Sequence, residues 1–398
     1  MKKIFISLLF LIASQSTFAQ TWSSITTNTT KSLLDIAFVD ANNGWVVGNA
    51  GTNIGEFGLI LKTTNAGTSF ASQNTVFYSN YKSISATDVN NAWIADRSLF
   101  IKHTNNGGTT WAGQTPGPSP TYPYNLLNDV FFKDANNGWA VGDNGTIYRT
   151  NDGGGTWTKQ TSGTTYNLQT VFFASTTVGW AAGDNSTMLR TPDGGITWVT
   201  VTLSLAVIFQ GNRINDMFFL NSNVGWTTIS EGAILKTIDG GQTWNTYLLN
   251  GGSTIFSIFF TDAYTGWAVG TFGYVGKSTD GGATWTQQTG FNSSQNYTKV
   301  FFTDANHGWV CGTGGLLYKY VNGNTCPSTL TPTGTITTNQ KAATSVTTIA
   351  GTSGAGTLNI IPNAANVVYQ AGSFVRLNPG FVANKTSVFT AKILAGCN

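Results

Sequence analysis

Tryptophan recurs in this chain at two fixed places in a repeated unit, and this regularity restricts the possible fold strongly. Seven tryptophans follow a small residue at steps of 48, 46, 41, 46, 41 and 42 residues: Trp45, Trp93, Trp139, Trp180, Trp226, Trp267 and Trp309. Five more each lie 18 residues after one of these: Trp111, Trp157, Trp198, Trp244 and Trp285. Phe70 takes this second position in the first unit. Seven units of about 40–50 residues predict an all-β fold, a seven-bladed β-propeller.

Residues 127–160 show how one unit divides into four strands. Leu127 to Phe132 has the β-branched and aromatic content of a buried inner strand. Turns rich in Asn, Asp and Gly separate it from expected strands at 139–142, 146–150 and 156–160. The seventh unit lacks its outer tryptophan, and Trp22, before the first unit, is the one tryptophan that belongs to none of the seven units. We therefore expect residues 21–26 to complete the last blade by pairing around 316–320.

The first 19 residues have the three parts of a secretory signal. Lys2 and Lys3 form its charged start, residues 4–12 its apolar run, and Thr17-Phe18-Ala19 a small-residue cleavage site. We expect the mature chain to be exported, as a secreted or cell-surface protein. No later segment is long and apolar enough to predict a membrane span. With 9% charged residues and a formal net charge of +3, the composition does not indicate binding to nucleic acid.

The outer strand of most units follows a run of the form Thr/Ser-x-Asp-x-Gly-x-Thr-Trp, which resembles the Asp-box of sialidase-type propellers. The carboxylates of its good copies are Asp152, Asp193, Asp239 and Asp280. The whole unit, over residues 22–323, is similar to the photosystem II stability and assembly factor family, which implies a propeller at residues 20–323. We interpret the Asp-box as structural, since one carboxylate per turn gives too few ligands for calcium. Neither a metal nor a cofactor is expected.

Residues 324–398 have a different pattern from the propeller units. Short apolar runs alternate there with Gly, Pro and Asn turns, which predicts a small all-β module of stacked strands. The string from Gln370 to Phe381 resembles the three-coathanger-stack module of exported proteins from Gram-negative bacteria. Cys326 and Cys397 bracket the module, so we predict a disulfide between them, worth about 4 kcal/mol in the chain-entropy model. Cys311 replaces an apolar strand residue and is expected to be a buried thiol.

A basic residue precedes the Asp-box position in every unit, and we name this set the basic ring. Its members are Lys62, Lys102, Arg149, Arg190, Lys236, Lys277 and Lys319. One interpretation is a contact of each cation with a neighbouring tryptophan or with solvent. The other is a surface for an anionic partner. The sequence favours the first interpretation and leaves the second open.

Three insertions interrupt the regular spacing of the units. One insertion falls in a loop between a second and a third strand, and the other two fall in loops that connect one blade to the next. Loops of these two kinds open on the same face of a propeller. Aromatic residues on loops are typical of recognition sites, although insertions also arise by neutral drift. The candidate binding residues on these insertions are Glu56, Phe57, Tyr122, Tyr124, Phe209 and Arg213.

No catalytic constellation is evident in the sequence. The mature chain has five arginines, and its only glutamates are Glu56 and Glu231, which is a poor match to the three arginines and Tyr/Glu pair of sialidases. We expect a monomeric, non-enzymatic binding or assembly protein that engages a protein or a glycan at its loop-rich face. The alternative is a sialidase-like or other glycan hydrolase with an atypical site. Two or three carboxylates converging at the propeller mouth would favour the hydrolase, and an aromatic mouth without them would favour binding.

Overall fold

The structure is a computed structural model. It describes residues 21–49, 58–73, 80–97, 100–116, 126–203, 211–249 and 252–321, together with five short segments between 329 and 393. The chain divides into two compact units, one of which is Trp22–Tyr320. The other comprises Met1–Thr21 and Val321–Asn398. Residues 1–20, with the predicted secretory signal, and both Cys326 and Cys397 lie outside the described residues.

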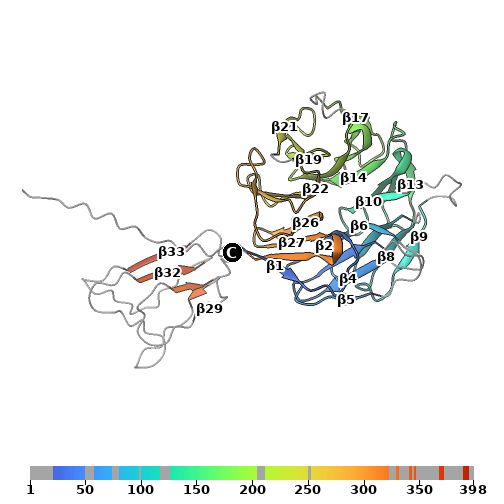
Figure 1. Ribbon diagram of the computed structural model, residues 1–398. Coiled ribbons are helices and arrows are strands. Elements are labelled where there is room, and N and C mark those ends of the chain that lie inside the picture. The colour runs from blue at the N-terminus through green and yellow to red at the C-terminus, as the bar shows by residue number, and fades with distance from the viewer. Residues whose placement is uncertain are drawn as a thin grey trace, which may run out of the picture. The chain divides into compact units, whose positions relative to one another are not determined.

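The first unit is a seven-bladed β-propeller in which each blade is a four-stranded sheet (Figure 1). The inner strands are β2 (Leu33–Phe38), β6 (Tyr81–Ala86), β10 (Leu127–Phe132), β14 (Leu168–Phe173), β18 (Ile214–Phe219), β22 (Ile255–Phe260) and β26 (Tyr297–Asp304). The second strands are β3 (Gly44–Gly48), β7 (Ala92–Asp96), β11 (Gly138–Gly142), β15 (Gly179–Gly183), β19 (Gly225–Ile229), β23 (Gly266–Gly270) and β27 (His307–Gly312). Fold class and blade number are thus as the tryptophan spacing predicts.

The third and fourth strands lie progressively further from the centre. The third strands are β4 (Leu59–Thr63), β8 (Ile101–Thr104), β12 (Ile147–Thr150), β16 (Met188–Thr191), β20 (Ala233–Thr237), β24 (Val275–Ser278) and β28 (Leu317–Val321). The outer strands are β5 (Ala71–Ser72), β9 (Ala112–Gln114), β13 (Thr158–Gln160), β17 (Val199–Thr200), β21 (Asn245–Leu248), β25 (Thr286–Gln287) and β1 (Thr21–Ile25). Short 3-10 turns join second to third strands in three blades: η1 (Asp143–Gly145), η2 (Asp184–Ser186) and η4 (Thr313–Gly315).

The N-terminal strand closes the ring. Strand β1 pairs with β28, so the last sheet has the order β1-β28-β27-β26 and combines both ends of the propeller sequence. Trp22 of β1 packs edge-on against Trp267, with ring centroids 5.3 Å apart, and against Phe291 at 5.6 Å. This pairing confirms the predicted role of Trp22.

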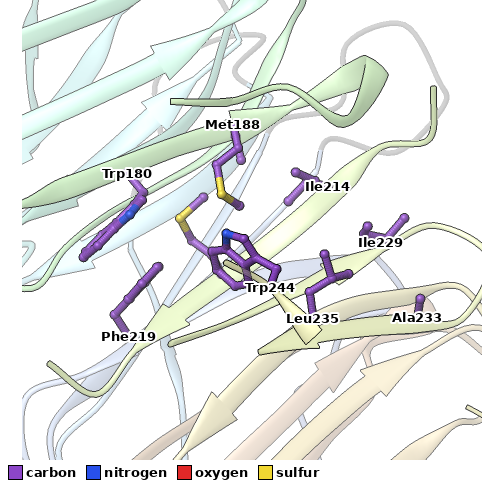
Figure 2. Close-up of a cluster of buried hydrophobic side chains, with 10 residues drawn as sticks. Trp180, Met188, Ile214, Phe219, Ile229, Ala233, Leu235 and Trp244 are labelled. Carbon is purple, nitrogen blue, oxygen red and sulfur yellow. The ribbon is translucent and has the colours of Figure 1, made fainter. Parts of the chain in front are cut away.

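Adjacent blades are joined by stacked aromatic rings. The tryptophan of each second strand is buried. Trp180 lies parallel to Phe219 of the next blade at 3.5 Å between centroids, and Trp244 meets the same ring edge-on (Figure 2). A glycine precedes most of these tryptophans because an added Cβ would overlap a ring; at Gly225 it would lie 2.2 Å from the Phe219 ring. The tryptophan repeat is therefore an interface between blades.

Five short strands are described in the C-terminal part of the chain: β29 (Thr329–Leu330), β30 (Gln340–Ala342), β31 (Ser345–Val346), β32 (Val367–Ala371) and β33 (Phe389–Ile393). Strands β30, β32 and β33 form a parallel sheet, and β29 pairs in parallel with β31. The first six blades of the propeller, by contrast, are antiparallel throughout. Within the described residues, no helix has the length and apolar character needed to cross a membrane.

Candidate binding site at the mouth of the central channel

A cavity of about 220 Å³ lies where the inner strands begin. In the first six blades, the inner strand has a β-bulge near its start. The bulge places two consecutive residues opposite one residue of the second strand, as between Leu127 and Asp129 in β10. The same irregularity occurs in β26, between Tyr297 and Lys299. Because a bulge re-aims side chains, residues from all seven blades contribute to this mouth.

One equivalent position on the seven inner strands forms what we name the polar collar. It is the residue after the bulge: Asp35, Ser83, Asp129, Thr170, Asp216, Ser257 and Lys299. Three carboxylates in blades 1, 3 and 5 alternate with hydroxyls, and blade 7 supplies the single ammonium. All but Ser257 line the cavity.

The collar carboxylates bind the backbone of the next blade. In each case Oδ2 accepts the N–H of the next inner strand: Asp35 from Ile84 at 2.8 Å, Asp129 from Val171 at 2.8 Å and Asp216 from Ile258 at 3.2 Å. Oδ1 accepts the N–H of the following residue on its own strand. These contacts hold three pairs of blades together and satisfy N–H groups that burial would otherwise leave without partners.

Lys299 crosses the collar to two of the carboxylates. Its Nζ lies 3.2 Å from Asp216 Oδ2 and 3.9 Å from Asp35 Oδ1. Burial alone would lower the pKa of Lys299, but the carboxylates raise it above its ordinary value, so the side chain is charged. One ammonium does not compensate three carboxylates, of which Asp35 and Asp216 are buried and Asp129 is half-buried. Burial accordingly raises the pKa of Asp35 and raises that of Asp129 to about 7, despite the opposing charge of Lys299.

Two cations lie at the outer rim of the mouth, one in blade 2 and one in blade 5. Lys82 and Arg213 line the cavity. Arg213 is half-exposed, and its Nε donates to Asp184 Oδ1 at 2.7 Å. Burial lowers the pKa of Lys82, and the charges of Arg97 and Arg213 lower it further. The rim therefore combines accessible positive charge with the acidic collar beneath it.

A second cavity of about 200 Å³ continues from the collar along the channel. We name its wall of five half-buried phenylalanines the aromatic tier: Phe131, Phe172, Phe218, Phe259 and Phe301. Neighbouring rings in this series have centroids 4.6–5.6 Å apart. Blades 1 and 2 place Ala37 and Ser85 at the equivalent position. The wall is thus aromatic on one side and made of small residues on the other.

Of the candidate binding residues, only Arg213 belongs to the described part of the chain, and it lies at the mouth. Glu56, Phe57, Tyr122, Tyr124 and Phe209 lie outside the described residues. The strands that flank the three insertions are β3 and β4, β9 and β10, and β17 and β18. In an antiparallel blade, the second and outer strands end where the inner strand begins. The three insertions therefore follow strand ends on the face of the propeller where the inner strands begin, and the cavity lies on this same face.

The basic ring mostly contacts aromatic rings and backbone carbonyls. Cations lie over the second-strand tryptophan in four blades: Lys62, Arg190, Lys236 and Lys277, at 4.5–5.9 Å from the ring centroid. Lys62 also donates to the carbonyls of Gly107 at 2.7 Å and Val89 at 3.2 Å in the next blade. Arg149 pairs in register with Trp139 in the same way. These contacts fit the interpretation in which the cations stabilise the blade interfaces.

The placement of Lys102 in the basic ring is wrong by one residue. In blade 2 the partner of Trp93 is His103, and Lys102 is opposite Ile94. His103 stacks on Trp93 with centroids 4.5 Å apart, whereas Lys102 lies over Phe100 at 5.5 Å. The sequence showed this, because Lys102 is two residues before Thr104 while every other member directly precedes its Asp-box or equivalent position.

The Asp-box carboxylates hold their own turns. Asp152 accepts the backbone N–H of Thr156 at 2.9 Å and the hydroxyls of Thr156 and Thr150 at 2.7 Å. Asp193, Asp239 and Asp280 make equivalent bonds. These bonds lower the pKa of each of the four carboxyls to about 2. Across the described residues, no group of three His, Cys, Asp or Glu side chains is arranged to hold a metal ion.

Cys311 is fully buried on β27, as expected. Burial raises the pKa of its thiol to about 12, so the reactive thiolate is disfavoured. The polar collar, in contrast, was not predicted. A signal for it existed: Asp35, Asp129 and Asp216 each lie three residues before the last phenylalanine of an inner strand that otherwise reads as apolar. A charge at a buried position of that kind indicates a network or a site.

The family follows from a match that spans most of the chain. The model of the photosynthesis system II assembly factor YCF48 matches residues 14–117, 120–251 and 248–321. The chain belongs to this family. Among curated proteins, none matches it.

Solved structures with the same fold include two members of the family. A structure described as YCF48 bound to D1 peptide has a TM-score of 0.63 and 21% identity, covering 75% of this chain and 96% of that one. YCF48 from Cyanidioschyzon merolae has a TM-score of 0.62 and 23% identity, over 77% and 100% of the two chains. A catalytically inactive virginiamycin B lyase from Staphylococcus aureus, with quinupristin, has a TM-score of 0.62 at 10% identity, over 76% and 99%. These likenesses show the fold alone.

Proposed function

We propose that this protein is an exported, non-enzymatic binding or assembly factor that engages a segment of a protein partner at the mouth of its central channel. The observation that carries the proposal is the mouth itself, where a cavity with a cationic rim opens at the same end of the blades as all three insertions. Membership of an assembly-factor family supports a binding role. A family member has been solved with a peptide, which supports a protein partner over a glycan.

Site-specific photocrosslinking tests which end of the propeller binds. A photoreactive amino acid is placed at Leu34 or Gln169, which line the mouth, or at Ile238 or Lys133, which are exposed at the other end of the sheets. We expect the two mouth positions to give the same protein adduct in intact cells, and the other two to give none of it. Adducts formed only from Ile238 and Lys133 would overturn the proposal.

The glycan hydrolase remains a second candidate because of one observation. Three carboxylates do converge below the mouth, and the pKa of Asp129 is raised to about 7, which suits a general acid. Against this, the oxygens of each carboxylate already accept backbone N–H groups within and between blades. That arrangement explains the carboxylates without catalysis, so we place the binding function first.

A direct assay separates the two functions. The native protein and Asp129→Asn are incubated with a panel of labelled glycans, and released sugar is measured. The binding proposal predicts no release by either protein above a heat-denatured control. Hydrolysis by the native protein that falls at least a hundredfold in Asp129→Asn would establish the enzyme instead.

A further inference from the structure

The aromatic tier is two rings short of complete. Five blades contribute phenylalanine to it, but Ala37 and Ser85 occupy the equivalent places in blades 1 and 2. The cavity bounded by these two residues and the five rings measures about 200 Å³. Aromatic rings favour tilted and edge-to-face neighbours at the spacing already present in the tier. The space is therefore suited to a further aromatic ring.

The carboxylates above this space favour a hydrogen-bond donor. A carboxylate offers about four acceptor sites. Asp35 accepts one backbone N–H at each oxygen, and Asp129 accepts two N–H groups and the Ser83 hydroxyl. Lys299 donates its hydrogen bonds to Asp216 and lies 3.9 Å from Asp35. Asp35 and Asp129 thus border the cavity with acceptor capacity that the collar does not fill.

We propose that the aromatic tier is an anchor pocket for a tyrosine side chain of the bound partner, with the ring completing the tier and the phenol donating to Asp35 or Asp129. This inference rests on the proposed function, because the pocket continues from the mouth through shared collar residues. It specifies the partner further, as a protein segment that presents an accessible tyrosine. Buried aromatic anchors of this kind supply much of the binding energy of an interface.

Three small probes test the pocket in the full-length protein. They are p-cresol, which is the tyrosine side chain alone; toluene, which lacks the donor; and N-acetyltyrosinamide, which adds a peptide backbone. Binding is followed by titration calorimetry and ligand-observed NMR. We expect saturable one-to-one binding of p-cresol and N-acetyltyrosinamide, with toluene at least tenfold weaker. Equal binding of toluene would contradict the role of the collar, and binding of p-cresol without N-acetyltyrosinamide would contradict a partner side chain as the occupant.

Two substitutions in the pocket, one that fills it and one that removes a ring from its wall, are compared with a control substitution on the surface. Ser85→Phe adds the ring that five blades carry and should abolish probe binding, while Ser222→Phe, on an exposed turn, should leave it unchanged. Ser85 Oγ accepts the Phe132 N–H at 2.9 Å, so Ser85→Phe can also reduce stability. Phe259→Leu, which removes one wall ring, is therefore measured as well and should weaken binding at least fivefold.

The outcomes distinguish this inference from the proposed function. Unchanged probe binding in both pocket variants would overturn the anchor pocket. If the mouth positions crosslink to a partner while no probe binds, the inference fails and the proposed function stands. If probes bind but partner adducts form only at Ile238 and Lys133, the proposed function fails instead.

Discussion

At the residue scale, the buried charges of the polar collar dominate the electrostatics of the propeller. Asp35 and Asp216 are buried, and each is bonded to backbone N–H groups of two blades. Lys299 provides the only ammonium among the seven collar positions. Because the collar has more carboxylates than cations, its aspartates Asp35 and Asp129 hold a proton at higher pH than exposed aspartates do. The stability of the folded protein therefore depends on the protonation of the collar.

The contribution of Asp129 to stability should be lost as the pH rises from about 4 to 7. Burial raises the pKa of Asp129 from 3.8 to about 7, so in this window Asp129 holds its proton more tightly in the folded protein than in the unfolded chain, and increasing pH lowers its contribution to the free energy of unfolding. Asp129→Asn should flatten this dependence. Urea unfolding of both proteins at pH 4.5, 5.5 and 7 measures it. An equally steep dependence in Asp129→Asn would show that Asp129 is not the responsible group.

His103→Lys should stabilise the protein, most clearly at low pH. Burial lowers the pKa of His103 below 6.5, and its Nε2 is buried with no hydrogen-bond partner. His103 therefore lowers the stability of the folded state increasingly as the pH falls below 6.5. A lysine would supply the cation that other blades place over their tryptophan, worth about 0.5–1 kcal/mol. The advantage should grow between pH 7 and 5 in denaturant unfolding, and His307→Asn, the matched control, should show no such gain.

At the element scale, strand β1 decides whether the ring is closed. It forms the outer strand of a sheet whose other three strands come from the opposite end of the propeller sequence. Without it, β28 would present an unpaired edge. The aromatic contacts of Trp22 with Trp267, Phe291 and Tyr320 add to the pairing.

Trp22→Ala should lower the free energy of unfolding by about 2–3 kcal/mol, because a large half-buried ring is lost from an aromatic cluster. Ser23→Ala, at the next, exposed position, should change it by less than about 0.5 kcal/mol. Deleting residues 20–27 should cost more than either substitution. Thermal and urea unfolding measure all three. A truncated chain as stable as the native one would rule out closure by β1.

The sequence predicts elements better than it predicts the site. Tryptophan spacing, Asn/Asp/Gly turns and β-branched strands are local signals, and they predict the four strands of residues 127–160 to within two residues at each boundary. The polar collar depends on contacts between residues far apart in the sequence, such as Asp129 with Val171 and Asp216 with Lys299, which are 42 and 83 positions apart. Only the closed ring brings those residues together. The offset of Lys102 is a similar case, since strand register decides which side chain faces Trp93.

At the scale of the whole molecule, the propeller has two different ends. One end has the channel mouth, the cationic rim and the bases of the insertions. The other has the Asp-box turns, whose carboxylates are held by their own loops, and the tryptophan interfaces between blades. A rigid ring with regular turns at one end and irregular loops at the other is well suited to positioning a recognition surface.

The predicted disulfide between Cys326 and Cys397 is tested on the full-length protein, purified without reductant. Peptide mapping without reductant should find this pair, and Cys311 should react with iodoacetamide only after denaturation, because it is buried and its thiol pKa is raised to about 12. A Cys311–Cys326 linkage would contradict both the disulfide and the burial of Cys311.

A pair of charge reversals tests whether the mouth of the channel binds the partner. Arg213→Glu changes the rim, and Lys133→Glu makes the same change on an exposed turn at the other end of β10. Exposed charges contribute little to stability, so both variants should fold normally. The affinity of the crosslinked partner is measured for the native protein and both variants. We expect at least tenfold weaker binding for Arg213→Glu and a change within about twofold for Lys133→Glu, since each factor of ten corresponds to about 1.4 kcal/mol. Loss of binding in Lys133→Glu with Arg213→Glu unaffected would place the functional surface at the Asp-box end and contradict binding at the mouth.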